Sequence, residues 1–213
     1  MTPETSQLSI IHGIASSSDE LRVDVLIDGR RVAAGLRFGG SVGPRTVHAG
    51  SHRFEVRAAD GAARELVDRV VSIRGGRSLS LLAHGSRGAV GPGIDVVEND
   101  VRPLARYIGR LAVHDATADP MLEVELGISP VVRVLPDARF ALLRAAGPGD
   151  TATLVVAAFV AHSIRVRSPG PDELVVDLDD LRVSGSRSTN VFIVGSASDG
   201  SLRLVTESVA AGP

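Results

Sequence analysis

Alternation of apolar and charged residues over Leu21–Val32 constrains the fold of this chain more than any other feature. Apolar side chains take every second position and charged side chains take most positions between them, which is the pattern of a strand with one buried face. Asp28 and Gly29 then supply residues that tolerate a positive φ in a two-residue turn. We therefore predict a strand, a tight turn and a returning strand over Arg31–Leu36.

Turn residues recur roughly every 8–12 residues, which is the spacing of an antiparallel β-sandwich. Ala49 and Gly50 separate two short apolar runs and predict a second hairpin. No segment has the periodicity of a convincing amphipathic helix. The further strands that we expect are residues 9–12, 46–48, 52–57, 66–73, 79–83 and 94–97. The predicted fold class is all-β.

Three segments of the first half recur in the same order in the second half, which indicates a duplicated domain. The matches join residues 73–86 to 183–196, Ile10–His12 to Ala112–His114, and Ile94–Val97 to Leu202–Val205. We therefore predict two tandem antiparallel β-sandwich domains. The first repeat covers residues 1–97, a short connector covers 98–109, and a second, divergent repeat covers 110–213.

The second repeat differs from the first in two stretches. Val124–Gly127 lacks the aspartate of the hairpin turn, and Thr151–Ala161 is apolar at successive positions. A strand without a polar face has to be covered on both sides, so we expect most of this stretch in a core. The alternative is a surface between domains, in a homodimer or around a ligand. The candidate residues for that surface are Thr153, Val155, Ala157, Phe159 and Tyr107.

The composition excludes several kinds of site. The chain has no cysteine, and all 23 of its basic residues are arginine. Disulfides, thiolate ligands, Schiff bases and a P-loop lysine are therefore excluded. A net charge of −2 argues against nucleic acid as a partner. Because only 3% of the residues are aromatic, a carbohydrate-binding surface would be unusual, and we expect no cofactor.

The first seven residues lack the basic and apolar regions of a signal peptide. No apolar run reaches the ~18 residues of a membrane span. We therefore expect no transmembrane segment and, for the chain as written, a cytoplasmic location. A secreted or cell-surface location is expected instead if the chain is a mature or trimmed product.

Several short motifs occur together in order. They are Ile10–His12 with Ala15, Val23–Gly29, Leu36–Gly39, Ala49–Gly50 before His52–Arg57, and Gly75–Gly85. In these motifs the chain resembles a bacterial family, the domain of unknown function numbered forty-three ninety-seven, which usually occurs in tandem on secreted or cell-surface proteins. The resemblance covers nearly all of the first repeat and both ends of the second. It implies a pair of immunoglobulin-like or transthyretin-like sandwiches with a surface or binding role, and it implies no catalytic residues.

Two histidines are the weak catalytic candidates. His12 and His114 take the same position in matched segments, at the end of the first strand of each repeat. A ring nitrogen bonded to a neighbouring loop carbonyl would explain this recurrence without chemistry, and the alternative is a paired functional role. Asp115 lies beside His114, which makes the second repeat the better place to look for acid–base chemistry.

His48 and His52 are the weak metal-site candidates. They flank Ala49–Gly50 and would lie diagonally across the mouth of the predicted hairpin. Zinc needs three or four ligands, and the sequence specifies no carboxylate near them. We therefore favour exposed histidines at strand ends and no metal.

We predict a non-catalytic interaction or structural protein that binds another protein or an envelope polymer. The alternative is an intracellular protein that binds an apolar small molecule, or a biosynthetic cyclase-type enzyme, with its pocket at the apolar stretch of the second domain or between the domains. Such an enzyme would act mainly by holding its substrate in a reactive pose.

Overall fold

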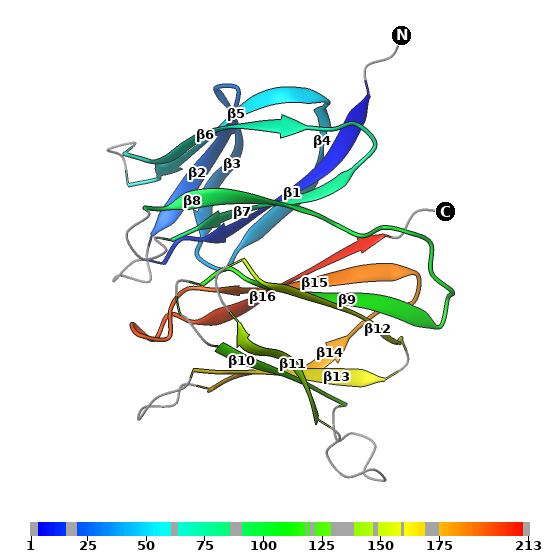
Figure 1. Cartoon of the computed structure of the whole chain (residues 1–213). Coiled ribbons are helices and arrows are strands. Elements are labelled where there is room, and N and C mark those ends of the chain that lie inside the picture. The colour runs from blue at the N-terminus through cyan, green and yellow to red at the C-terminus, as the bar shows by residue number, and fades with distance from the viewer. Residues whose placement is uncertain are drawn as a thin grey trace. The chain divides into compact units, whose positions relative to one another are not determined.

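The structure, a computed structural model, describes residues 4–15, 21–60, 64–85, 91–117, 119, 122–128, 139–146, 149–158, 160–168 and 175–210. Within these residues the chain forms sixteen strands and no helix (Figure 1), so they contain no helix that could cross a membrane. The chain divides into two compact units, Met1–Asn99 and Asp100–Pro213, which we call unit 1 and unit 2. The prediction of an all-β chain is confirmed.

Unit 1 is a sandwich of two four-stranded sheets. Its strands are β1 (Thr5–Gly13), β2 (Arg22–Ile27), β3 (Arg30–Arg37), β4 (Ser41–His48), β5 (Gly50–Ala58), β6 (Glu65–Ile73), β7 (Ser78–His84) and β8 (Gly93–Glu98). One sheet has the order β4-β1-β7-β8 and the other has the order β3-β2-β5-β6. The inner faces of both sheets share one apolar core, which contains the fully buried residues Leu8, Val25, Phe54 and Leu81.

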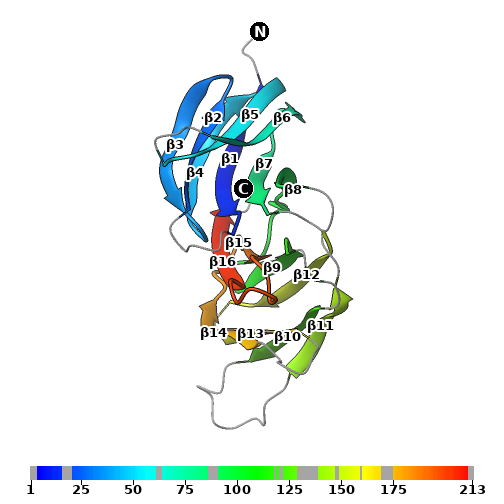
Figure 2. The ribbon, with the colours of Figure 1, turned by 90° about the vertical axis from the view of Figure 1, so that its left-hand side faces the viewer.

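Unit 2 repeats this arrangement. Its strands are β9 (Ile108–Asp115), β10 (Leu122–Ile128), β11 (Arg139–Ala146), β12 (Thr151–Ala157), β13 (Ala161–Arg167), β14 (Val175–Arg182), β15 (Arg187–Val194) and β16 (Arg203–Ala210). The sheet orders are β12-β9-β15-β16 and β11-β10-β13-β14, so each strand takes the place of the strand eight numbers before it (Figure 2). Leu111, Val124, Ile164 and Val191 are fully buried in its core. Two tandem β-sandwiches are therefore present, as predicted.

One pair of strands in each unit is parallel. β1 pairs with β7, and β9 pairs with β15, whereas the remaining ladders among the described strands are antiparallel. From Leu8 in β1 and from Leu79 in β7, every residue to the end of the strand is buried. Burial on both faces is typical of parallel strands. The sequence analysis predicted antiparallel pairing only. The parallel pair was not predicted, because no local turn joins its two strands.

The hairpin predicted after Leu21 is confirmed. β2 and β3 pair antiparallel. The two residues between them have positive φ angles, 51° at Asp28 and 75° at Gly29. Two consecutive left-handed residues are what a type I′ turn requires, and such a turn matches the right-handed twist of the flanking strands.

The second predicted hairpin is wrong. β4 pairs with β1, and β5 pairs with β2 and β6, so Ala49 and Gly50 lie where the chain crosses from one sheet to the other. Turn residues between two apolar runs mark a change of direction. They do not determine whether the second run pairs with the first.

The expectation that Thr151–Ala161 is one strand covered on both sides is also wrong. The strand ends at Ala157, and it is the edge strand β12, paired only with β9 among the described strands. Val155 is 58% exposed and Leu154 is 37% exposed. Apolar composition alone does not determine burial, since much of any protein surface is apolar.

Phe54→Ala should destabilise unit 1 by about 3–5 kcal/mol, because it leaves a cavity at a fully buried position. The control is Val70→Ala, at a valine that is 65% exposed on the neighbouring strand β6, and it should change the free energy of unfolding by less than about 0.5 kcal/mol. Amide hydrogen exchange of β2 and β5 peptides in the full chain measures both effects. Equal effects of the two variants would contradict this description of the core.

Candidate functional site

His12 lies near the end of β1 with its ring fully buried. Its Nδ1 accepts a hydrogen bond from the backbone N–H of Ile14 at 3.2 Å, and its Nε2 donates to the carbonyl of Leu21 at 3.4 Å. Both bonds require the neutral ring with its proton on Nε2. Burial lowers the pKa of His12 to about 4, although the bond to Leu21 acts in the opposite direction. The predicted bond from this ring to a loop carbonyl is therefore confirmed.

His114 has different surroundings. Its ring stacks on Phe192, with centroids 4.8 Å apart and an interplanar angle of 18°, and its Nδ1 is 3.0 Å from the Thr151 hydroxyl. Burial lowers the pKa of His114, and the Asn190 side chain acts in the opposite direction. The ring lies on the face of β9 opposite to Val113, which belongs to the core.

The counterpart of His12 in unit 2 is Asp115. In each unit the backbone of this residue forms two hydrogen bonds, one as donor and one as acceptor, with the two residues directly before the fourth strand, which is β4 in unit 1 and β12 in unit 2. The partners are Gly39 and Gly40 for His12, and Gly149 and Asp150 for Asp115. The predicted match of His12 with His114 is therefore wrong by one residue, and a slip of one residue places a side chain on the other face of a sheet.

The side chains at this shared position form the same kind of hydrogen bond in both units. Oδ1 of Asp115 accepts from the backbone N–H of Thr117 at 2.9 Å, as Nδ1 of His12 accepts from the N–H two residues further along. Both side chains therefore hold the start of the loop that follows the first strand. His114 and Asp115 are neighbours on one strand and point to opposite faces, so the structure does not assemble them as an acid–base pair.

His52 is bonded at the corner between β4 and β5. Its Nε2 lies 2.9 Å from the carbonyl of His48, and its Nδ1 lies 2.6 Å from a carboxylate oxygen of Asp28. The hydrogen bond from Asp28 raises the pKa of His52, and the same bond lowers the pKa of Asp28. His48 contributes its backbone and not its ring. The residues that the structure describes contain no group of three or more potential metal ligands.

His162 occupies the same corner in unit 2, between β12 and β13. Its Nε2 lies 3.0 Å from the carbonyl of Ala157, the last residue of β12. Its buried Nδ1 has no hydrogen-bond partner within the described part of the chain. The reason is visible in the sequence, because Gly127 stands where unit 1 has Asp28. We call His52 and His162 the corner histidines.

The corner histidines were not predicted as a pair, although the sequence contains a signal for them. Each lies two residues before a core residue of its strand, Phe54 in β5 and Ile164 in β13. Aligning the units by their buried residues matches the two histidines. The match of residues 73–86 with 183–196 has the same offset, so extending it back without a gap also pairs them.

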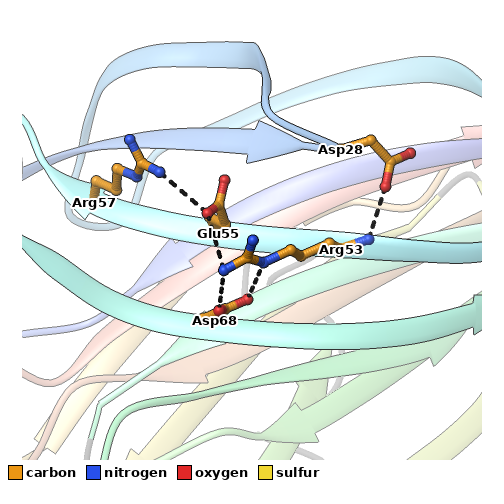
Figure 3. A network of polar contacts seen from close by, with 5 residues as sticks. All are labelled: Asp28, Arg53, Glu55, Arg57 and Asp68. Carbon is orange, nitrogen blue, oxygen red and sulfur yellow. Dashed lines mark hydrogen bonds and ion pairs between the residues drawn. The ribbon is translucent and has the colours of Figure 1, made fainter.

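An ion-pair network covers the outer face of β5 and β6 in unit 1 (Figure 3). The guanidinium of Arg53 binds Asp68 through two hydrogen bonds, and Oε1 of Glu55 lies 3.1 Å from Arg57 and 3.6 Å from Arg53. The Arg53 backbone N–H donates to Asp28 at 2.9 Å. Glu55 is only 4% exposed because these side chains surround it. The charges in the network are therefore largely paired with one another.

The corresponding face of unit 2 has its own ion pairs. Arg165 forms a two-bond contact with Asp177 at 2.6 and 3.1 Å, and Arg167 lies 3.9 Å from Glu125. Exposed pairs of this kind contribute only ~0–1 kcal/mol each to stability. They also keep the outer faces of these two sheets polar.

The large exposed apolar side chains that the structure describes in unit 2 lie on or beside one edge strand, β12. Tyr107 and Val155 are both 58% exposed, and Leu154 is 37% exposed. The N–H of Ala158 donates to the carbonyl of Tyr107 at 3.0 Å, which joins the end of β12 to the start of β9. We call β12 together with Tyr107 the β12 edge.

The structure brings most of the predicted interface residues to this edge. Thr153, Val155 and Ala157 are exposed on β12, and Tyr107 lies beside its end. Phe159 lies outside the described residues. The nearest charged side chain in register, Arg110 opposite Val155, is only 5% exposed and is bound to Asp100 at 3.1 Å. β12 therefore has no charged side chain, and the exposed charged residues nearest in sequence, Asp150 and Arg106, lie beyond its end and beside Tyr107.

A family model described as a domain of unknown function (DUF4397) matches residues 6–125. The matched residues run from the second residue of β1 through β8 and β9 into β10. No curated protein matches the chain.

Solved structures resemble the chain at low identity. A candidate cell adhesion protein from Bacteroides uniformis is 10% identical, with a TM-score of 0.36 and coverage of 99% of this chain and 98% of the other. A candidate cell adhesion protein from Bacteroides ovatus is 8% identical, with a TM-score of 0.35 and the same coverage. The C-terminally truncated tip fimbrial protein Mfa3 from Porphyromonas gingivalis is 10% identical, with a TM-score of 0.33 and coverage of 96% and 98%. These values are too low to transfer a function.

Unit 1 should lose stability as the pH falls from 6.5 toward 4. The pKa of His12 is about 4 in the folded chain and 6.5 for a free ring, so the unfolded state takes up a proton first. The loss reaches up to about 3 kcal/mol at the lower end of this window. Hydrogen exchange of unit 1 peptides measures it. His12→Gln should remove this pH dependence. His48→Gln, at an exposed histidine, is the control and should retain it. The same change of stability with pH in the wild type and both variants would refute the assignment to His12.

Asp28→Asn should lower the pKa of His52 toward 6.5, because it removes the carboxylate that favours the charged ring. Asparagine tolerates the positive φ of this position, so the turn is retained. Below pH 6.5 the wild-type pair adds stability, which is lost as the pH rises through the raised pKa of His52. Imidazole NMR titration measures the shift. Asp24→Asn, which removes an ion pair to Arg31 on the same sheet, is the control and should leave the pKa of His52 unchanged.

Proposed function

This chain belongs to the DUF4397 family, which is defined by its sequence and not by an activity, and from its own surface we propose that it is a non-catalytic interaction protein. The proposed binding surface is the β12 edge, and the proposed partner is a protein, including a protein component of a cell envelope. The family is usually found on secreted or cell-surface proteins. An exported or surface location is therefore part of this proposal, in place of the cytoplasmic location expected above.

One observation carries the proposal: among the residues of unit 2 whose exposure is described, the large exposed apolar side chains lie on or beside one edge strand, which has no charged residue. Leu154 and Val155 are adjacent on β12, with side chains on opposite faces of the sheet, and Tyr107 is bonded through its backbone just beyond the end of the strand. A free edge offers unpaired backbone hydrogen-bonding groups, and an apolar edge adds a gain from burial when a partner covers it. The other large exposed apolar side chains among the described residues are Val70 on β6 and Val96 on β8, both in unit 1.

The bonding of the candidate catalytic residues also favours an interaction role. His12 and Asp115 hold loop backbones, and the Nδ1 of His114 is bonded to a threonine hydroxyl. A general acid or base needs a ring nitrogen or carboxylate oxygen within reach of a substrate. The alternative with an apolar pocket has lost its main support, because the strand proposed to line that pocket is an exposed edge.

A charge placed on the β12 edge tests the proposal. The wild-type chain, Val155→Lys and Val70→Lys are immobilised and exposed to solubilised bacterial envelope proteins, and the retained proteins are quantified by mass spectrometry. At least one protein should be retained equally by the wild type and by Val70→Lys, and about tenfold less by Val155→Lys.

Val70→Lys is the matched control, since it introduces the same charge at an exposed valine of another edge strand. The protein that loses binding is then purified and titrated against the same three chains. Retention of the same proteins in the same amounts by all three chains would contradict the proposal.

A further inference from the structure

Most edge strands of this chain carry the features that prevent pairing with another molecule. The eight edge strands among those described are β3, β4, β6 and β8 in unit 1 and β11, β12, β14 and β16 in unit 2. Charged residues and proline on an edge oppose the addition of another strand. Each of these strands has at least one charged residue except β12, whose sequence is Thr-Ala-Thr-Leu-Val-Val-Ala.

The counterpart of β12 in unit 1 is β4, and the two strands differ in length. β4 has eight residues and β12 has seven, although both pair with the first strand of their unit. The extra residue of β4 is accommodated by a shift of register between Leu8 and Ile10, opposite a segment that contains Pro44 and Arg45. A bulge of this kind interrupts an edge and twists it away from pairing. β12 pairs with β9 without any shift.

The backbone groups of β12 that face away from β9 can be identified. In an antiparallel ladder, alternate residues direct both N–H and C=O toward the partner strand. Ala158 donates to Tyr107 beyond one end of β12, and Asp150 accepts from Asp115 beyond the other. Even-numbered residues therefore bond to β9. The backbone groups of Thr151, Thr153, Val155 and Ala157 point outward, and no other described strand lies beyond them.

From these observations we infer that β12 pairs antiparallel with β12 of a second copy of this chain, which joins the two sheets into one continuous sheet. The inference rests on the proposed function, since it uses the same edge, and it names the occupant of that edge. A twofold axis places each residue of one strand opposite a residue of the same strand. A charged residue at or next to the twofold axis would face a like charge on the second copy, whereas β12 has no charged residue.

The register follows from the length of the strand. All seven residues of β12 pair only if Leu154, its central residue, lies on the twofold axis. Thr153 then faces Val155 of the second copy, and Thr151 faces Ala157, so the outward backbone groups meet one another. Leu154 faces Leu154 of the second copy as a non-hydrogen-bonded pair, whose Cα atoms lie ~4.5 Å apart. The most exposed side chains of the strand become partly covered.

Cysteine substitution tests this register directly, because the natural chain has no cysteine. A Cα separation of ~4.5 Å lies within the range of a disulfide. Leu154→Cys should form a disulfide-linked dimer under mild oxidation, seen on a non-reducing gel, much faster than Val96→Cys. Val96 is the matched control, since it is also 37% exposed and lies on the edge strand β8.

Light scattering of the wild-type full chain over a broad concentration series gives an independent measurement. The mass should rise toward twice that of one chain, and Val155→Lys should shift this rise to a concentration about tenfold higher or more. Cross-linking of Leu154→Cys no faster than Val96→Cys, or a wild-type chain that stays monomeric at the highest concentration, would overturn the inference. A monomeric chain whose envelope partner is lost in Val155→Lys would overturn the self-pairing and leave the proposed function standing.

Discussion

Each unit depends on the backbone ladder between its first and seventh strands. In unit 1 this ladder pairs Gln7 with Ser78 and continues to Gly13 with His84. The ladder joins the first strand of the unit to a strand near its end. Both strands lie in the middle of one sheet, where most of their residues are buried on both faces. The other sheet forms from the strands between them. A ladder between residues about seventy positions apart has a high cost in loop closure, so the hairpins are expected to form before it.

This distinction explains how much of the fold could be predicted. The β2–β3 hairpin is local, and Asp28 with Gly29 specifies its turn. The parallel pair has no local signal, and the corner at Ala49 and Gly50 uses the same residue types as a hairpin. The position of β12 was missed because an apolar strand at an edge and one in a core have similar sequences. At the proposed interface, Thr153, Val155, Ala157 and Tyr107 could be named from the sequence, but their exposure is known only from the structure, in which β12 is an edge strand.

The buried polar groups show that the units have diverged in their interiors. In unit 1 the corner histidine has two partners, the carbonyl of His48 and the carboxylate of Asp28. In unit 2 the carboxylate is missing, and His162 Nδ1, Ser188 Oγ and Thr189 Oγ1 are buried without hydrogen bonds among the described residues. Each such atom costs about 1–3 kcal/mol relative to a satisfied one. Among the described residues, unit 2 therefore leaves more buried side-chain polar atoms without hydrogen bonds than unit 1, and its fourth strand is the more apolar one.

The one-residue difference in length between β4 and β12 has a consequence for how such proteins change during evolution. The two strands differ by the equivalent of a single codon, and one sandwich core forms beside a fourth strand of eight residues whereas the other forms beside one of seven. Duplication supplies a spare copy in which that change is tolerated. A tandem array of these units can therefore differ from unit to unit in whether the fourth strand has a bulge, without any new domain.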